Sequence, residues 1–183
     1  MTDLAQQKRT PLLAVNYVDK PLSEADFNDL CDCSDAAIRD GSGGLGWVEL
    51  PDRAILERFW RGVITMPSRD LFVARLDNVI CGGCQVIHPS PNNEAHAHAA
   101  ELKGLFISPW ARGHGLSRML LDAAEDRARA EGRSVMNLGV RDTMDVAITL
   151  YESAGYKMIG HHDEYAFVHG EYVSGRYYTK RLA

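Results

Sequence analysis

With 183 residues, 45% of them apolar and 25% charged, the chain has enough material for one soluble domain spanning 1–183. Its net charge of −5 argues against the basic surface that nucleic-acid binding favours. No apolar run approaches the ~20 residues of a membrane span, and the first residues, MTDLAQQKRTPLLAV, lack the apolar segment of a signal peptide. We therefore expect a cytoplasmic protein that binds neither nucleic acid nor membranes.

The predicted elements follow the order β-α-α-β-β-β-α-β-α-β-β, which indicates a single α/β domain. In chain order they are a strand at 12–18, helices at 23–41 and 53–64, a hairpin at 70–89 that turns near Leu76-Asp77-Asn78, a polar loop at 90–97, a strand at 98–109, a helix at 116–132, a strand at 134–140, a helix at 143–155, and strands at 156–167 and 172–182. Residues that favour caps mark the helix ends: Ser23 and Thr143 are the expected N-caps, and Gly41, Gly132 and Gly155 the expected C-terminal stops.

The four cysteines form two close pairs, Cys31 with Cys33 and Cys81 with Cys84. A zinc site or a redox pair is one interpretation of such spacing. However, residues i and i+2 of a helix do not share a face, and residues i and i+3 of a strand point to opposite faces. We therefore favour buried thiols in a reducing compartment and expect no metal.

Two histidines alternate in the sequence, His96 and His98, so a metal pair on a strand is conceivable. The spacing places no third ligand beside them. We expect both side chains to lie at a solvated loop edge.

The segment 41–46, GSGGLG, matches the dinucleotide-binding pattern G-x-G-x-x-G literally. That pattern requires a strand before it and a helix that starts within it. Here a helical pattern comes before the segment, and Pro51 separates it from the next helix. We interpret 41–46 as a loop, near the mouth of a site if it is functional at all.

The segment 112–117, RGHGLS, has the context that 41–46 lacks, because a strand leads into it and a helix starts within it. Backbone N–H groups at a helix N-terminus attract phosphate, and glycines at 113 and 115 allow the main chain to approach a bulky anion. Arg112 adds a positive charge with the geometry for phosphate. Spacing alone leaves a phosphate-binding loop and a plain glycine turn open.

The strand, loop and helix around Arg112-Gly113-His114-Gly115-Leu116-Ser117 resemble the GNAT superfamily of N-acetyltransferases, whose signature is R/Q-x-x-G-x-G/A. The segment AITLYESAGYKMIG, 147–160, is similar to that family's later helix–strand unit. The stretches GLGWV, AELKGLFISPWARGHGL and YYTKRL also resemble the tabtoxin-resistance acetyltransferases. The resemblance implies the GNAT fold, with a mixed, mostly antiparallel central sheet flanked by helices.

The resemblance implies acetyl-CoA as the acetyl donor and no metal. Its pantetheine would bind the end of the fourth strand at Leu105, Phe106 and Ile107, and its pyrophosphate would bind the loop amides from Arg112 to Ser117, with the side chain of His114 in solvent. The sequence departs from the family pattern at two positions. Ser117 replaces the usual glycine or alanine, and Met144 stands where many members have asparagine.

Acetyl transfer to an amine requires removal of a proton from the amine, stabilisation of the oxyanion and protonation of the departing thiolate. The resemblance implies Tyr151 as the general acid, although the apolar helix face around it also suits a core residue. It implies Glu101 as the base, unless Lys103 simply neutralises that carboxylate on the same strand face. A backbone N–H near Phe106 would polarise the thioester carbonyl.

We therefore expect an enzyme that moves acetyl from acetyl-CoA to a primary amine by direct attack in a ternary complex. A small-molecule acceptor, such as an amino acid, an amine metabolite or an antibiotic, is the first expectation, and a protein N-terminus or lysine is the second. The alternative from another class is a non-catalytic, regulatory CoA-binding module. Residues 21–66 and 161–173 would set the acceptor, and the cluster 161–164, HHDE, either borders the acceptor site or forms a polar turn. The sequence leaves a homodimer open.

Overall fold

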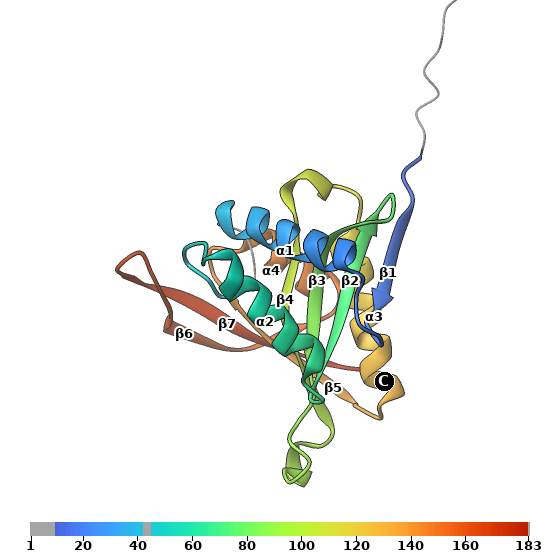
Figure 1. The fold of residues 1–183 in the computed structure, drawn as a ribbon. Coiled ribbons are helices and arrows are strands. Elements are labelled where there is room, and N and C mark those ends of the chain that lie inside the picture. Colours follow the sequence, from blue (N-terminus) through green and yellow to red (C-terminus); the bar gives the residue numbers. More distant parts are fainter. Residues whose placement is uncertain (1–9, 42–44, 183) are drawn as a thin grey trace, which may run out of the picture.

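The computed structural model describes residues 10–41 and 45–182, and these form one seven-stranded sheet with helices on both faces (Figure 1). The elements are β1 (Leu13–Tyr17), α1 (Glu24–Arg39), α2 (Arg53–Thr65), β2 (Arg69–Leu76), β3 (Val79–Ile87), β4 (Ala99–Ile107), α3 (Leu116–Ala130), β5 (Val135–Arg141), α4 (Asp145–Ser153), β6 (Lys157–Val168) and β7 (Glu171–Arg181). Two short 3₁₀ turns, η1 (Glu94–His96) and η2 (Pro109–Ala111), precede β4 and α3 respectively. The predicted order of strands and helices is confirmed.

Most of the helix ends follow the expected cap chemistry. Ser23 Oγ accepts a hydrogen bond of 3.1 Å from the backbone N–H of Asp26 at the start of α1. The three glycines that follow α1, α3 and α4 have φ values of +72°, +74° and +90°, the left-handed conformation that suits glycine after a helix. The prediction of Thr143 as an N-cap is wrong, because α4 begins one residue later with Met144 as its N-cap and has no side-chain cap.

The strand order in the sheet is β1-β2-β3-β4-β5-β7-β6, and only β4 and β5 run parallel to one another. The turn between β2 and β3 is made by Asp77 and Asn78, with φ values of +49° and +71°. Two such left-handed residues are typical of a two-residue hairpin whose twist matches that of its strands. The sheet is therefore mixed but mostly antiparallel, as the resemblance implies.

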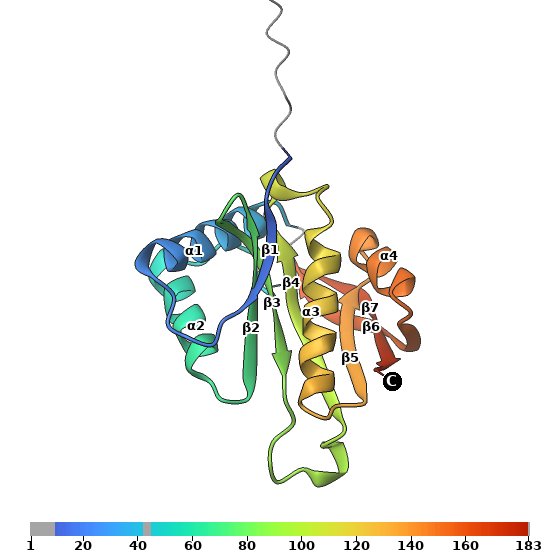
Figure 2. The same ribbon diagram turned by 90° about the vertical axis from the view of Figure 1, so that its right-hand side faces the viewer.

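The helices divide between the two faces of the sheet (Figure 2). One core cluster joins α1 and α2 to one face and includes Leu30, Trp60, Leu71 and Phe106. The second cluster joins α3 and α4 to the opposite face and includes Leu120, Leu138 and Tyr151. Trp60 is held in the first cluster by a hydrogen bond of 3.0 Å from its ring N–H to Ser34 Oγ.

Strand β4 carries a bulge that divides it into two parts. Gly83 pairs with Phe106 and Gln85 pairs with Lys103, so Gly104 and Leu105 together lie opposite one residue of β3. Gly104 has a φ of +60°, the left-handed conformation that glycine adopts in this type of bulge. The bulge bends the strand, so its C-terminal part leaves the line of the N-terminal part.

The parallel pairing between β4 and β5 is short. It comprises the three pairs Ala99–Val135, Ala100–Met136 and Glu101–Asn137. Beyond Glu101 the two strands diverge, and the edge of β4 that faces β5 is left without strand partners. This divergence opens the sheet in its middle, next to the segment 112–117.

The four cysteines are free and buried. Burial raises the pKa of the Cys31 and Cys81 thiols to about 11, so both are protonated thiols near neutral pH. Within the described residues, no helix is long and apolar enough to cross a membrane.

Candidate active site

The segment 112–117 leads from η2 into α3 and contains two glycines in the left-handed conformation. Gly113 and Gly115 have φ values of +82° and +78°, and a Cβ at either position would meet no atom within 4 Å. Helix α3 starts at Leu116, where Gly115 is an N-cap without a side-chain hydrogen bond. In the described chain, the first helical bonds are donated by the N–H groups of Arg118 and Met119 to Gly115 O, so the N–H groups of 113–117 stay available. The loop is thus suited to an anion.

The partly exposed Arg112 side chain links this loop to α1 and to the end of β4. Its Nη2 lies 2.7 Å from Asp40 Oδ2 at the end of α1, and its Nε donates a 3.3 Å hydrogen bond to Ile107 O at the end of β4. Asp40 therefore compensates part of the positive charge of Arg112.

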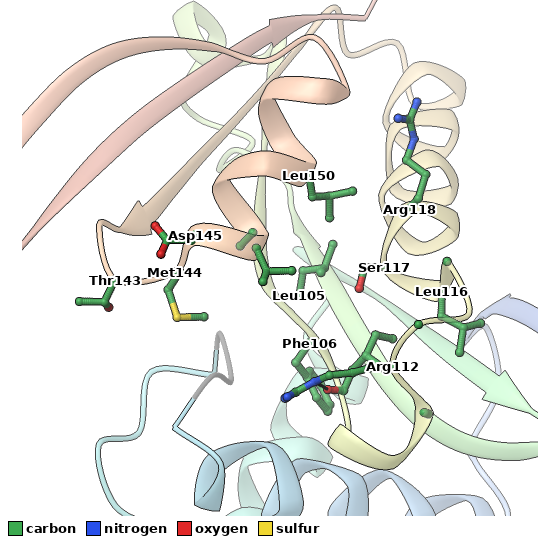
Figure 3. A pocket seen from close by; sticks show the side chains of 16 residues that line it. Leu105, Phe106, Arg112, Leu116, Ser117, Arg118, Thr143, Met144, Asp145 and Leu150 are labelled. Atoms are coloured by element: carbon green, nitrogen blue, oxygen red, sulfur yellow. Dashed lines mark hydrogen bonds between the residues drawn. The ribbon is translucent and has the colours of Figure 1, made fainter.

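A first cavity of about 490 Å³ lies between the diverging strand β4, the loop and α4. Figure 3 shows it bounded by Leu105 of β4, by Ser117 and Arg118 at the start of α3, and by Met144 and Leu150 on the α4 side. Its lining is mostly apolar and includes residues 105–107 of β4, beyond the pairing with β5, and residues of the loop. A long molecule with an apolar arm and an anionic group matches this lining.

A second cavity of about 700 Å³ lies on the sheet face that carries α1 and α2. Glu101 and Lys103 of β4 line it, and Arg141 of β5 closes one side. The pairing of Glu101 with Asn137 places 137, 139 and 141 of β5 on the same sheet face as Glu101. The aromatic rings of Tyr165 and Tyr177 form another wall.

The two cavities meet where β4 and β5 diverge. Leu105, Met144 and Ala147 line both of them. Through the same opening, Tyr151 of α4 lines the second cavity although α4 packs on the opposite face of the sheet. The divergence of β4 and β5 therefore allows residues of α4 to line cavities on both faces of the sheet.

The Tyr151 side chain combines burial with access to the second cavity. The residue is 7% exposed, and its ring packs edge-on against Tyr156 with centroids 5.9 Å apart. Burial raises the pKa of Tyr151 well above its ordinary value, and Cys84 and Tyr165 add smaller upward contributions. The phenol is therefore protonated near neutral pH, the form that can donate a proton.

Glu101 lies at the last residue pair before the strands diverge, and it lines the second cavity. Its Oε1 is 3.3 Å from Lys103 Nζ, so the ion pair considered from the sequence is present. The Glu101 side chain is nevertheless 44% exposed. Among the described residues around the second cavity, it is the only carboxylate.

Tyr165 is part of the site although the sequence did not single it out. Its ring lies across two glycines of the neighbouring strands: a Cβ on Gly139 would be 2.5 Å from Tyr165 Oη, and a Cβ on Gly175 would be 2.3 Å from Tyr165 Cγ. Burial raises the pKa of Tyr165, as do Tyr177 and Glu101, while Arg141 lowers it. Glycines inside predicted strands were the available signal, because they mark a close approach.

The model of the GNAT acetyltransferase family matches residues 36–156. The chain belongs to the GNAT family. A GNAT relative from Azospirillum brasilense, an uncharacterized N-acetyltransferase encoded between hisH and hisA, is 54% identical over 122 residues, which are 67% of this chain and 72% of that protein. The IAA acetyltransferase of the same organism is 37% identical over 95 residues, 51% of this chain and 58% of its own.

Solved structures confirm the GNAT fold. YncA from Salmonella typhimurium, solved with its cofactor acetyl-CoA, has a TM-score of 0.73 at 16% identity and covers 93% of this chain and 94% of its own. A ribosomal-protein-alanine N-acetyltransferase from Brucella melitensis has a TM-score of 0.73 at 20% identity, with 92% of this chain and 99% of that chain covered. At these identities the likeness extends to the fold alone.

Most of the residues expected from the GNAT signature lie together. Leu105, Phe106 and Ile107 line the first cavity, as do Arg112, Gly113, Gly115, Leu116 and Ser117. His114 does not line it and its side chain is exposed, as expected. Ser117 is half-buried at the cavity wall, and Met144 lies where the two cavities meet.

The remaining polar candidates lie elsewhere. His96 and His98 are exposed in the loop before β4, as expected. The cluster 161–164 is not a polar turn but part of β6, and none of its residues lines the second cavity. His161 contacts Asp142, with Nε2 and Oδ2 2.9 Å apart. Of the segment 41–46, residues 42–44 lie outside the described residues, and Leu45 and Gly46 border the second cavity.

Proposed function

We propose that this GNAT protein transfers an acetyl group from acetyl-CoA to the primary amine of a small molecule by direct attack in a ternary complex. The observation that carries the proposal is the junction of two cavities where β4 and β5 diverge, at Leu105, Met144 and Ala147. Two substrates bound in the two cavities would meet only there. Holding both together supplies a large part of the catalysis of such a transfer.

The first cavity fits acetyl-CoA by the chemistry of its lining. The N–H groups of 113–117 would bind the pyrophosphate, and the unpaired edge of β4 at Leu105–Ile107 would bind the amides of the pantetheine arm. Acetyl-CoA supplies an acetyl group activated as a thioester. Leu105, in the bulge of β4, lines both cavities, and a backbone N–H near Phe106 would stabilise negative charge on the thioester oxygen there.

The reaction requires two proton transfers. The amine nitrogen attacks the carbonyl carbon, a C–N bond forms, and the C–S bond breaks to release CoA. Glu101 accepts the proton that the amine loses, directly or through water, and Tyr151 donates a proton to the departing sulfur. The position of Tyr151 at the second cavity supports its part.

The size of the second cavity supports a small-molecule acceptor. Its volume of about 700 Å³ falls within the range of roughly 300–1,000 Å³ that is usual for small-molecule sites. A peptide N-terminus is therefore the comparison substrate rather than the first expectation. We also propose a single domain over 1–183, from the chain length and the order of its elements, and a cytoplasmic location.

The proposal is tested by following release of the CoA thiol with a panel of amines and short peptides. We expect turnover that depends on both acetyl-CoA and an amine, with an amide as the product by mass. Tyr151→Phe is expected to lower kcat by about 100-fold, the low end for a lost general acid, with the affinity for CoA unchanged. Tyr156→Phe is the matched control, since Tyr156 is buried beside Tyr151 but lines neither cavity.

Two results would contradict the proposal in different ways. Tight binding of CoA without turnover of any amine would favour the non-catalytic module. Equal rates for Tyr151→Phe and Tyr156→Phe would remove Tyr151 as the acid while leaving the acetyl transfer intact.

A further inference from the structure

The second cavity is positively charged in a protein that is negatively charged. The chain has a net charge of −5, yet the charged side chains that line the second cavity are three cations, Arg69, Lys103 and Arg141, and one carboxylate, Glu101. Lys103 is paired with Glu101 at 3.3 Å. After this pair is set aside, the guanidinium groups of Arg69 and Arg141 are the remaining charged groups of the lining. The electrostatic field in this cavity therefore favours an anionic ligand.

Neither guanidinium has a carboxylate partner in residues 10–41 and 45–182. Arg69 Nη1 donates a 2.7 Å hydrogen bond to the neutral oxygen Oε1 of Gln85, while Arg141 Nη2 lies 3.9 Å from the sulfur of Met144. Asp142, the carboxylate next to Arg141 in the chain, is occupied by Ser174 and Arg176 at 2.5 and 2.6 Å. Paired donors of a guanidinium match the two oxygens of a carboxylate.

The two arginines differ in their distance from the junction of the cavities. Arg141 contacts Met144, which lines both cavities, so a carboxylate bound by Arg141 would lie beside the junction. Arg69 is tethered to Gln85, which lines the second cavity only. In an α-amino acid, a single carbon separates the amine from the carboxylate. When the carboxylate of such a molecule is bound by Arg141, its amine is held close to the junction, where the thioester would lie.

The geometry points to an α-amino acid as the acceptor, with its carboxylate bound by Arg141 and its side chain directed into the second cavity. This inference rests on the proposed acetyl transfer and names the class of its acceptor. The walls formed by Phe59, Tyr165 and Tyr177 are aromatic, so an aromatic amino acid is a suitable first probe.

The test compares three acceptors that share the phenethylamine skeleton and differ in the group on the carbon next to the amine: phenylalanine, phenylalaninamide and phenethylamine. Rates of thiol release are expressed per concentration of unprotonated amine, because the three amines differ in basicity. We expect kcat/KM to be about tenfold to a hundredfold higher for the acid than for the other two, the range for one charge-assisted hydrogen-bonded contact. The same comparison with a second, aliphatic series separates the effect of the carboxylate on kcat/KM from the effect of the aromatic ring.

Variants then locate the binding group. Arg141→Gln is expected to lower kcat/KM for the acid by about tenfold to a hundredfold and to leave the amide and the amine nearly unchanged. Arg141→Lys keeps the charge and is expected to recover part of the loss. Arg58→Gln is the control, because Arg58 is an exposed arginine of α2 that lines neither cavity. Calorimetric titration with CoA checks that the first cavity is intact in every variant.

The outcomes distinguish this inference from the proposed function. Equal rates for acid, amide and amine would overturn the α-amino acid assignment while the acetyl transfer stands, and so would a uniform loss across all three in Arg141→Gln. Absence of turnover with every amine and peptide would overturn the acetyl transfer itself.

Discussion

Gly175→Ala is the sharpest test of how the second cavity is built. The Cβ that this change adds would lie 2.3 Å from Cγ, 2.5 Å from Cδ1 and 2.8 Å from Cβ of Tyr165. Carbon atoms in contact sit ~3.5 Å apart or more, so the ring has to move by about 1 Å. The contacts are with the base of the side chain, and a rotation about its last bonds therefore cannot relieve them.

The cost follows from overpacking a fitted site. Such overpacking costs about 1–3 kcal/mol, and the lower chain entropy of alanine offsets roughly 0.5–1 kcal/mol of this. The net loss of about 1–2 kcal/mol corresponds to a fall in Tm of about 2–8 °C for a chain of this length. Because Tyr165 lines the second cavity and not the first, KM for the acceptor is expected to rise while the affinity for CoA stays constant.

Thermal unfolding and acceptor kinetics measure the two effects. Gly160→Ala is the matched control. Gly160 lies on the edge strand β6, next to β7, and its added Cβ would meet only Tyr177 Cδ2, at an ordinary 3.7 Å. In a double-mutant cycle, Tyr165→Ala removes the two nearest obstacles, Cγ and Cδ1, and leaves only the Cβ at 2.8 Å, so a coupling energy of about 1–2 kcal/mol is expected. The reasoning is refuted by a Tm of Gly175→Ala equal to that of Gly160→Ala, or by a coupling energy near zero.

Three further changes address other parts of the site. Gly115→Ala puts a side chain at a φ of +78°, which costs about 1–2 kcal/mol, and we expect a weaker calorimetric affinity for CoA; an unchanged affinity would argue against anion binding by this loop. Glu101→Gln is expected to lower kcat/KM by about 100-fold, because it removes the proposed base. Lys103→Gln leaves the carboxylate in place and is expected to change kcat/KM little. Similar losses in the two variants would point to a structural ion pair. Ser174 and two basic neighbours hold the pKa of Asp142 at about 2, below its ordinary 3.8. The contribution of these contacts to stability is therefore complete above pH 3.8 and lost as the pH falls through about 2, and an NMR titration of Asp142 with a midpoint at 3.8 or higher would contradict the ion cluster.

Local patterns predicted the elements of this fold well, because they depend on neighbouring residues. The cap at Ser23 and the left-handed glycine Gly132 are where their chemistry places them. The segment 112–117 was separated from the literal match at 41–46 by context, since only the former lies between a strand and a helix. The error at Thr143 concerns one residue at a helix start, and helix bounds are defined only to within one or two residues.

The walls of the second cavity were harder to predict, because they depend on strands that are distant in the sequence. Arg69 and Arg141 become neighbours of one cavity only when β2 and β5 are placed in the same sheet. Nothing in the residues around them marks either one. Tyr165 had a signal in Gly139 and Gly175, but only the register of β5, β6 and β7 shows which side chain those glycines accommodate.

The short ladder between β4 and β5 has a mechanical consequence. Three residue pairs are the only sheet hydrogen bonding between the described strands β1–β4 and β5–β7. A ligand in the first cavity would contact both β4 and α4. Because α4 connects β5 to β6, such a ligand would link the half of the sheet formed by β1–β4 to the half formed by β5–β7. Saturation at 100 times Kd adds about 2.7 kcal/mol to the free energy of unfolding. Amide hydrogens on both sides of the divergence should then exchange more slowly, and those of the β2–β3 hairpin should change least.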